Sequence, residues 1–194
     1  MEIPYTHGGD IYSRPIKMDY SANINPLGLP EGVKRELLCC VEENVCCIYP
    51  DSACRSLKMA LSEIHHVPKE WISCGNGAAD LIFALVAALR PRHALLLAPS
   101  FLEYSQALHL RGCETDSFML REDEDFSLDP FRLKEALFRA RAEKQPYDIL
   151  FLCNPNNPTG LPVKKEIVEE IGVVCKETGT WLAVDECFCD FLDE

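Results

Sequence analysis

The sequence predicts an α/β protein in three layers, with a mostly parallel sheet between two layers of helices. From residue 70 onward, short apolar runs typical of buried strands alternate with longer segments of helical periodicity. Such alternation is typical of parallel strands joined by crossover helices. In addition, polar loops follow the apolar runs at 148–152 and 180–184. Open α/β sheets bind ligands at loops of this kind, beyond the carboxyl ends of their strands.

The N-terminal quarter lacks this alternation. The first 30 residues are rich in Pro, Gly, Asn and Tyr, and we expect an ordered arm of loops there. Apolar residues recur every four positions over 31–47, which predicts an amphipathic helix that the Tyr-Pro-Asp sequence at 49–51 ends. We therefore expect an arm with a small-domain helix at 1–48 and a large domain, incomplete at its carboxyl end, at 49–194.

Each later element follows from its own pattern of apolar residues. A second helix carries apolar residues on one face at 57–64, and the segment at 78–89 is an almost wholly apolar helix. Turn-forming residues separate the remaining segments. We expect strands at 70–74, 94–98, 114–119, 148–152 and 180–184, and further helices at 101–110, 130–141 and 163–178.

Composition excludes several classes of function. The net charge of -12 and the pI of about 4.9 argue against nucleic acid or an anionic membrane surface as the main partner. No apolar run approaches the roughly 20 residues that span a bilayer, and the first residues are polar. We therefore expect neither a membrane span nor a signal peptide.

The cysteines favour a reducing compartment. There are 11 of them, an odd number, and no pair has CxxC spacing. Most lie in apolar stretches, where a reduced thiol packs as a small hydrophobic group. We expect no metal site, including at Cys187 and Cys189, and we expect a cytoplasmic location.

The two polar loops contain the most informative residues. The first reads NPNNPTG at 154–160 and offers the side-chain amide of Asn157; the second begins with Asp185 at the end of an apolar strand. A carboxylate there is costly unless it is paired, either in a salt bridge or with a ligand cation. An amide and a carboxylate suit a pyridine ring that has a phenolic oxygen and a basic nitrogen, which indicates pyridoxal 5'-phosphate.

Two further segments suit the same ligand, although each has a plainer interpretation. The Gly-Asn-Gly turn at 75–77 joins an expected strand to a helix whose free N–H groups would suit a phosphate. A simple helix-capping turn has the same sequence pattern. Phe101 and Tyr104 follow the next strand, where an aromatic ring either lies against a cofactor or packs in the core.

Taken in order, the motifs resemble the fold-type-I pyridoxal-phosphate enzymes, in their histidinol-phosphate aminotransferase branch. The agreement is best with the threonine-phosphate decarboxylase family of cobalamin biosynthesis and extends from residue 7 to residue 191. The matching segments are HGGD, DYSANINPLGLP, YPD, HHVPKEWISCGNG, APSFLEYSQAL, CNPNNPTG and DECFCDF.

The resemblance implies a role for each matching position around the cofactor. The backbone amides of Gly77, Ala78 and Ala79 would hold its phosphate, and Phe101 would stack on its ring. Tyr49 would reach the phosphate bound to the other subunit of a homodimer.

The resemblance also assigns catalytic and substrate positions. Asn157 would bond the phenolic oxygen, and Asp185 would pair with the pyridine nitrogen. His7, Gly8 and Asn25 would lie in a segment that closes over a small phosphorylated amino acid.

The implied reaction is decarboxylation of L-threonine O-3-phosphate to (R)-1-amino-2-propanol phosphate. Phe188 stands where aminotransferases of this branch usually carry tyrosine, which favours the decarboxylase. A histidinol-phosphate or related class I/II aminotransferase stays an alternative, as does a non-catalytic remnant of the fold.

The end of the chain matters for this interpretation. In the family, the Schiff-base lysine follows the strand-end aspartate by roughly 30 residues, whereas Lys164, Lys165 and Lys176 all precede Asp185. The strand expected near Ile72 would also lack its neighbour. We therefore expect a fragment that is inactive alone and poorly soluble.

Overall fold

The computed structural model describes residues 8–13 and 15–192, and the chain divides into two compact units, 1–55 and 56–194. The first unit contains an irregular arm, helix α1 (Glu31–Glu42) and a short 3-10 helix, η1 (Val45–Cys47). The helix expected over 31–47 is therefore shorter than predicted. It ends because Asn44 adopts the left-handed conformation, with φ of 57°, which asparagine tolerates better than most residues.

Helix α2 (Arg55–His65) confirms the second expected helix. Its start is fixed by Asp51, whose Oδ2 accepts the Arg55 N–H at 2.7 Å. His66 follows with a positive φ of 54° and ends it. The domain boundary expected at 48/49 stays a prediction.

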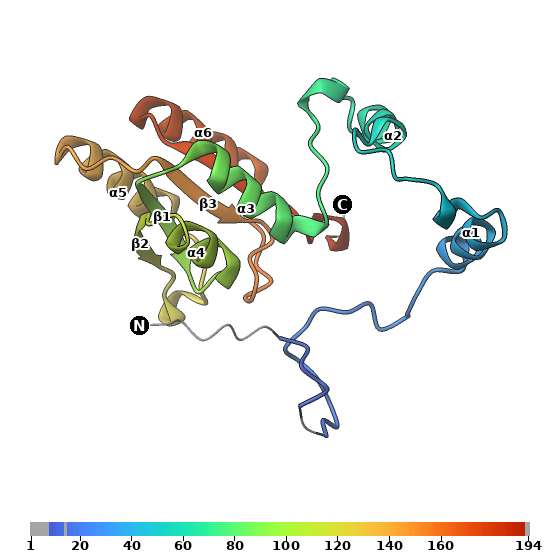
Figure 1. The fold of residues 1–194 in the computed structure, drawn as a ribbon. Helices are drawn as coiled ribbons and strands as arrows, with labels where there is room; N and C mark the ends of the chain where they lie inside the picture. The colour runs from blue at the N-terminus through green and yellow to red at the C-terminus, as the bar shows by residue number, and fades with distance from the viewer. Residues whose placement is uncertain (1–7, 14, 193–194) are drawn as a thin grey trace. The chain divides into compact units, whose positions relative to one another are not determined.

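The second unit contains a four-stranded sheet in the order β2-β1-β3-β4, with every pair of neighbours parallel (Figure 1). The strands are β1 (His93–Ala98), β2 (Glu114–Met119), β3 (Ile149–Cys153) and β4 (Trp181–Asp185). Four of the five expected strands are thus confirmed, each within a residue of its predicted bounds.

The prediction of a strand at 70–74 is wrong. A 3-10 helix, η2 (Lys69–Trp71), occupies its first half. Ile72 is extended, with φ of -98° and ψ of 126°, but no strand among the described residues pairs with it. Extended backbone becomes a strand only when a neighbour accepts its hydrogen bonds, so the apolar sequence alone did not suffice.

Four helices cover the sheet: α3 (Gly77–Leu89), α4 (Leu102–His109), α5 (Pro130–Ala142) and α6 (Lys165–Thr178). Figure 1 shows α3 and α4 in front of the strands and α5 and α6 behind them. Alternate residues of β3 point to the two faces: Ile149 and Phe151 pack with α3 and α4, whereas Leu150 and Leu152 pack with α5 and α6. All four are buried, as expected for a strand covered on both faces. The three-layer α/β/α prediction is confirmed.

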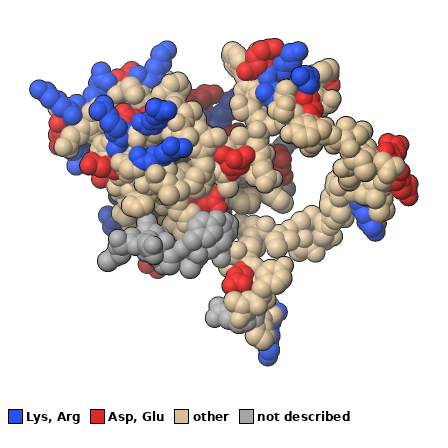
Figure 2. Space-filling view, in the orientation of Figure 1, with Lys and Arg blue, Asp and Glu red and all other residues tan. Residues whose placement is uncertain are grey.

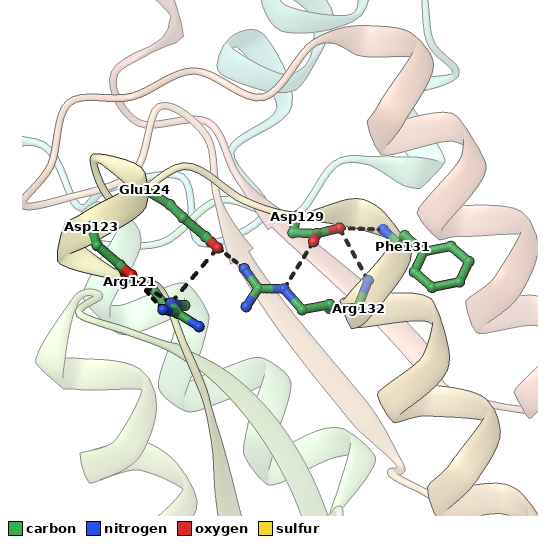
Figure 3. A network of polar contacts seen from close by, with 6 residues as sticks. All are labelled: Arg121, Asp123, Glu124, Asp129, Phe131 and Arg132. Atoms are coloured by element: carbon green, nitrogen blue, oxygen red, sulfur yellow. Dashed lines mark hydrogen bonds and ion pairs between the residues drawn. The ribbon is translucent and has the colours of Figure 1, made fainter.

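The acidic loop between β2 and α5 is held by its own ion pairs (Figure 3). Arg121 bonds Asp123 and Glu124, and Arg132 bonds Glu124 and Asp129. Asp129 also caps α5 by accepting two backbone N–H groups of its first turn. Asp123, Glu124 and Asp129 therefore have structural partners at the carboxyl edge of the sheet.

Surface charge is mixed on the face shown in Figure 2, where acidic and basic side chains are interspersed over the sheet-bearing unit. Within the described ranges, no helix is long and apolar enough to cross a bilayer. No group of three or more metal-ligating side chains gathers there either. All 11 cysteines are free thiols.

Candidate active site at the carboxyl edge of the sheet

The two polar loops lie side by side, as expected for neighbouring parallel strands. The last residues of β3 and β4 are in register, with Cys153 opposite Asp185. The Asn154 N–H then donates to the Asp185 carbonyl oxygen at 2.8 Å. Backbone pairing therefore brings the 154–160 loop next to the acid that ends β4.

Only one asparagine side chain of the first loop is left unused. Asn154 bonds the backbone N–H and carbonyl of Val163, at 2.7 and 3.1 Å. Asn156 is buried and donates to the Pro99 carbonyl at 3.1 Å. The half-buried Asn157 amide makes no side-chain hydrogen bond within the part of the chain that the structure describes. It is the amide available to an incoming ligand.

Asp185 is held by neutral donors. Its Oδ2 accepts the Tyr104 hydroxyl at 2.7 Å, and its Oδ1 accepts the Cys187 N–H at 3.1 Å. No ion pair among residues 8–13 and 15–192 involves it. The salt-bridge alternative is therefore not what the structure contains, and the half-buried carboxylate is able to pair with a ligand cation.

Tyr104 is a buried residue that lies directly behind Asp185 in this site. It is 1% exposed, and its ring stacks on Phe151 of β3 with centroids 4.8 Å apart and planes 14° apart. Burial and the hydrogen bond to Asp185 raise the pKa of Tyr104 well above its ordinary value. The hydroxyl consequently stays a donor at neutral pH.

Two thiols lie beside the acid, and both have a raised pKa. Burial raises the pKa of Cys153. Burial of the thiol, reinforced by a hydrogen bond to Asp185, raises the pKa of Cys187 to about 12. Neither is suited to act as a nucleophile at neutral pH, since a thiolate is needed for that.

The start of α3 provides free backbone donors. Gly77 has a φ of 85°, which favours glycine, and no side chain from the described residues caps the helix. Asp80 bonds the Asn76 N–H at 2.9 Å, outside the helix. The N–H groups of Gly77, Ala78 and Ala79 therefore remain without a capping side chain and suit an anion.

Phe101 is placed by the start of α4, where it is the N-cap residue. Its half-buried ring packs edge-on against Tyr104, with centroids 5.6 Å apart and planes 81° apart. The aromatic pair therefore links the start of α4 to Asp185. Sequence reasoning considered Tyr104 only as a stacking or core residue and missed its bond to the acid. No local pattern indicates that bond, because the two residues are 81 positions apart in the sequence.

The remaining predicted residues belong to the other unit or are not described. His7 lies outside the described residues. Tyr49 is 89% exposed. The amide of Asn25 bonds its own turn, through the Leu27 N–H at 3.0 Å. The backbone of Gly8 runs so close to Ser21 that a Cβ would not fit. The roles expected for these four residues stay predictions.

Comparison with known proteins decides the family. Residues 15–194 match the model of the family described as aminotransferase class I and II. This chain belongs to that family. Proteins of the family depend on pyridoxal 5'-phosphate.

Individual members of related families show which proteins this sequence is similar to. Threonine-phosphate decarboxylase of Salmonella typhimurium is 40% identical over 96% of this chain and 51% of its own length. Adenosylcobalamin biosynthesis bifunctional protein CobDQ of Leptospira interrogans is 31% identical over 98% of this chain and 22% of its own. This chain thus spans about half the length of the Salmonella relative.

The fold is shared with solved structures of the same class. Histidinol-phosphate aminotransferase from Sinorhizobium meliloti, in complex with pyridoxal-5'-phosphate, superposes with a TM-score of 0.76. The superposition covers 89% of this chain and 44% of the Sinorhizobium chain. Since the two sequences are only 21% identical, the likeness concerns the fold alone.

Proposed function

We propose that this chain is the amino-terminal part of a pyridoxal-phosphate-dependent threonine-phosphate decarboxylase. The observation that carries the proposal is the Asp185 carboxylate, which neutral donors hold and which pairs with no cation among the described residues. It lies one strand from the Asn157 amide, which those residues also leave unused. A protonated pyridine nitrogen and a phenolic oxygen are the partners that this pair lacks. The fit extends to the phosphate, since α3 starts with uncapped N–H groups.

Each residue has one task in this proposal. Asp185 accepts the ring N–H and thereby keeps that proton on the nitrogen, while Asn157 donates to the phenolic oxygen. The backbone of 77–79 binds the phosphate, and Phe101 lies against the ring. Bound pyridoxal phosphate supplies an electron sink for a bond broken at the α-carbon of an amino acid.

Further parts of the proposal concern the whole protein. The lysine that links the cofactor would come from a segment beyond Asp185. Tyr49 would reach the cofactor phosphate of a second subunit, so that the active enzyme is a homodimer. His7, Gly8 and Asn25 would face the substrate. We place the enzyme in the cytoplasm.

The substrate that we propose is L-threonine O-3-phosphate, with (R)-1-amino-2-propanol phosphate as the product in cobalamin biosynthesis. Support comes from the 40% identity to the Salmonella decarboxylase and from the relative named for adenosylcobalamin biosynthesis. Phe188, in place of a tyrosine, is a further argument.

A second candidate is a histidinol-phosphate aminotransferase. The match to the class I and II aminotransferase model favours it. The two activities differ in the bond broken, since a decarboxylase releases carbon dioxide and a transaminase consumes a keto acid.

The test uses a lysine-complete polypeptide, in which this chain is joined to the second half of the Salmonella relative. Carbon dioxide release from threonine phosphate, with no consumption of 2-oxoglutarate, is the expected result. Asp185→Ala should lower kcat/KM by at least about a hundredfold, because the electron sink loses its support.

The matched control is Asp190→Ala, an exposed acid just beyond the same strand, which should act like the wild type. Keto acid consumption without carbon dioxide would support the second candidate. No visible cofactor absorbance in the completed wild type would exclude both.

A further inference from the structure

A buried hydrogen bond behind the proposed cofactor site connects distant parts of the chain. Tyr104 on α4 and Asp185 at the end of β4 are 81 residues apart in sequence, yet the hydroxyl lies 2.7 Å from Oδ2. The strand β3 separates β1 from β4 in the sheet order. The bond therefore runs from a covering helix across the face of β3 to the strand-end acid.

The donor is fixed in place by packing. The Tyr104 ring is nearly parallel to Phe151 beneath it, 4.8 Å away, and perpendicular to Phe101 beside it. With 1% of its surface exposed, it has no room to change rotamer without disturbing the core. The hydroxyl therefore has one direction available, toward the acid.

Both oxygens of the acid are consequently oriented. Tyr104 donates to Oδ2, and the Cys187 N–H donates to Oδ1 at 3.1 Å. Two donors at different oxygens fix the plane of the carboxylate as well as its position.

We propose that Tyr104 is a positioning residue for the cofactor ring, acting through Asp185 and Phe101. Its hydroxyl holds the carboxylate in the plane where it accepts the ring N–H, and its ring supports the Phe101 side chain that lies against the ring face. The inference rests on the proposed function. It adds that Tyr104 fixes the orientation in which Asp185 would accept the ring N–H.

The Tyr104→Phe variant separates the effect of the hydroxyl from that of packing, because it removes the hydroxyl and keeps the stacked ring. The test measures binding of pyridoxal phosphate, labelled with 15N in the ring, to the 194-residue chain. Fluorescence titration gives the dissociation constant, and the 15N chemical shift reports protonation of the ring nitrogen. We expect Tyr104→Phe to bind about tenfold more weakly, as for a lost hydrogen bond to a charged group. We also expect its 15N signal to move toward the unprotonated position.

The chain offers a matched control at the opposite edge of the sheet. The Tyr147 hydroxyl also donates to an aspartate, Asp116 Oδ2, at 2.8 Å. Tyr147→Phe removes the same kind of bond and should leave both the affinity and the 15N shift unchanged.

Three results would overturn the inference. One is a Tyr104→Phe chain that binds with the affinity and shift of the wild type; another is a Tyr147→Phe chain that changes them equally; the third is a wild-type chain that does not bind the label. If circular dichroism shows that Tyr104→Phe does not fold, the Tyr104→His variant is measured instead, because its ring keeps an N–H that can donate a hydrogen bond. A folded histidine variant with wild-type shift supports the inference, and one with the unprotonated shift refutes it. The proposed function is judged separately, by carbon dioxide release from the completed enzyme.

Discussion

At the scale of single residues, the environment of Tyr104 has a measurable effect on stability. Burial and Asp185 raise its pKa in the folded chain above the value of about 10 that an unfolded chain has. Above pH 10, the unfolded chain therefore loses a proton that the folded chain keeps. Stability is fully present below that pH and falls as the pH rises, by about 1.4 kcal/mol for each unit per such tyrosine.

We predict that the free energy of unfolding falls more steeply between pH 10 and 11 in the wild type than in Tyr104→Phe. Urea unfolding at pH 9, 10 and 11 measures the difference. Tyr147, whose pKa is raised to about 12 mainly by burial, contributes in both proteins and cancels. Equal slopes would mean that the Tyr104 hydroxyl ionises normally in the folded chain.

At this scale the sequence indicated which side chains to expect at the site, but not their contacts. Asn157 and Asp185 were recognisable as candidates, the first as an amide in a loop with two prolines and a glycine, the second as an acid that ends an apolar strand. Their roles stay predictions. The bond from Tyr104 to Asp185 was not recognisable from the sequence, because it joins residues 81 positions apart. Which of the loop asparagines is structural also depended on backbone partners that no local pattern specifies.

At the scale of elements, two glycines in helices have opposite conformational requirements. Gly77 begins α3 with a φ of 85°, and a Cβ there would meet nothing within 4 Å. The cost of a substitution is therefore purely conformational. Gly172 lies inside α6 with no positive φ, and its added Cβ would be 3.9 Å from Leu182, an ordinary contact.

We predict that Gly77→Ala destabilises the chain by about 1 kcal/mol, the usual cost of a left-handed alanine. Gly172→Ala should instead stabilise it by roughly 0.5–1 kcal/mol, because alanine loses less backbone entropy in a helix. Urea titrations of both variants test this pair. Effects of the same sign would contradict the conformations that we describe.

Element prediction from sequence succeeded where the signal was local. Strands β1, β3 and β4 are apolar runs between turns, and helices α5 and α6 have clear boundaries, so their positions followed from periodicity. The failure at 70–74 was of another kind, because an extended segment needs a paired neighbour and not only suitable residues. Likewise, α1 stopped early at Asn44, whose conformation the apolar pattern does not report.

At the scale of the whole chain, the sheet formed by the described residues has an open edge at β4. Among those residues this strand pairs only with β3, and its first residue, Trp181, is 65% exposed. Unpaired backbone groups beside an exposed aromatic ring favour edge-to-edge association.

We predict that the 194-residue chain associates with increasing concentration, and that Trp181→Lys reduces this association, since a charge on an edge strand opposes pairing. Light scattering between low and high micromolar concentrations measures it. Phe131→Lys, a similarly exposed aromatic on α5, is the control and should have little effect. A chain that stays monomeric would show that the β4 edge is protected.

The pairing of β3 with β4 also determines which sequence changes the site could tolerate. Side chains of β3 alternate between two covering helix layers, so after a deletion of one residue within 149–153 each later residue of the strand would face the opposite layer. Asn157 and Asp185 would then be displaced relative to each other even though both were still present. The site should therefore tolerate point substitutions in β3 far better than the deletion of one residue. Related chains that keep both Asn157 and Asp185 should also keep the number of residues between them.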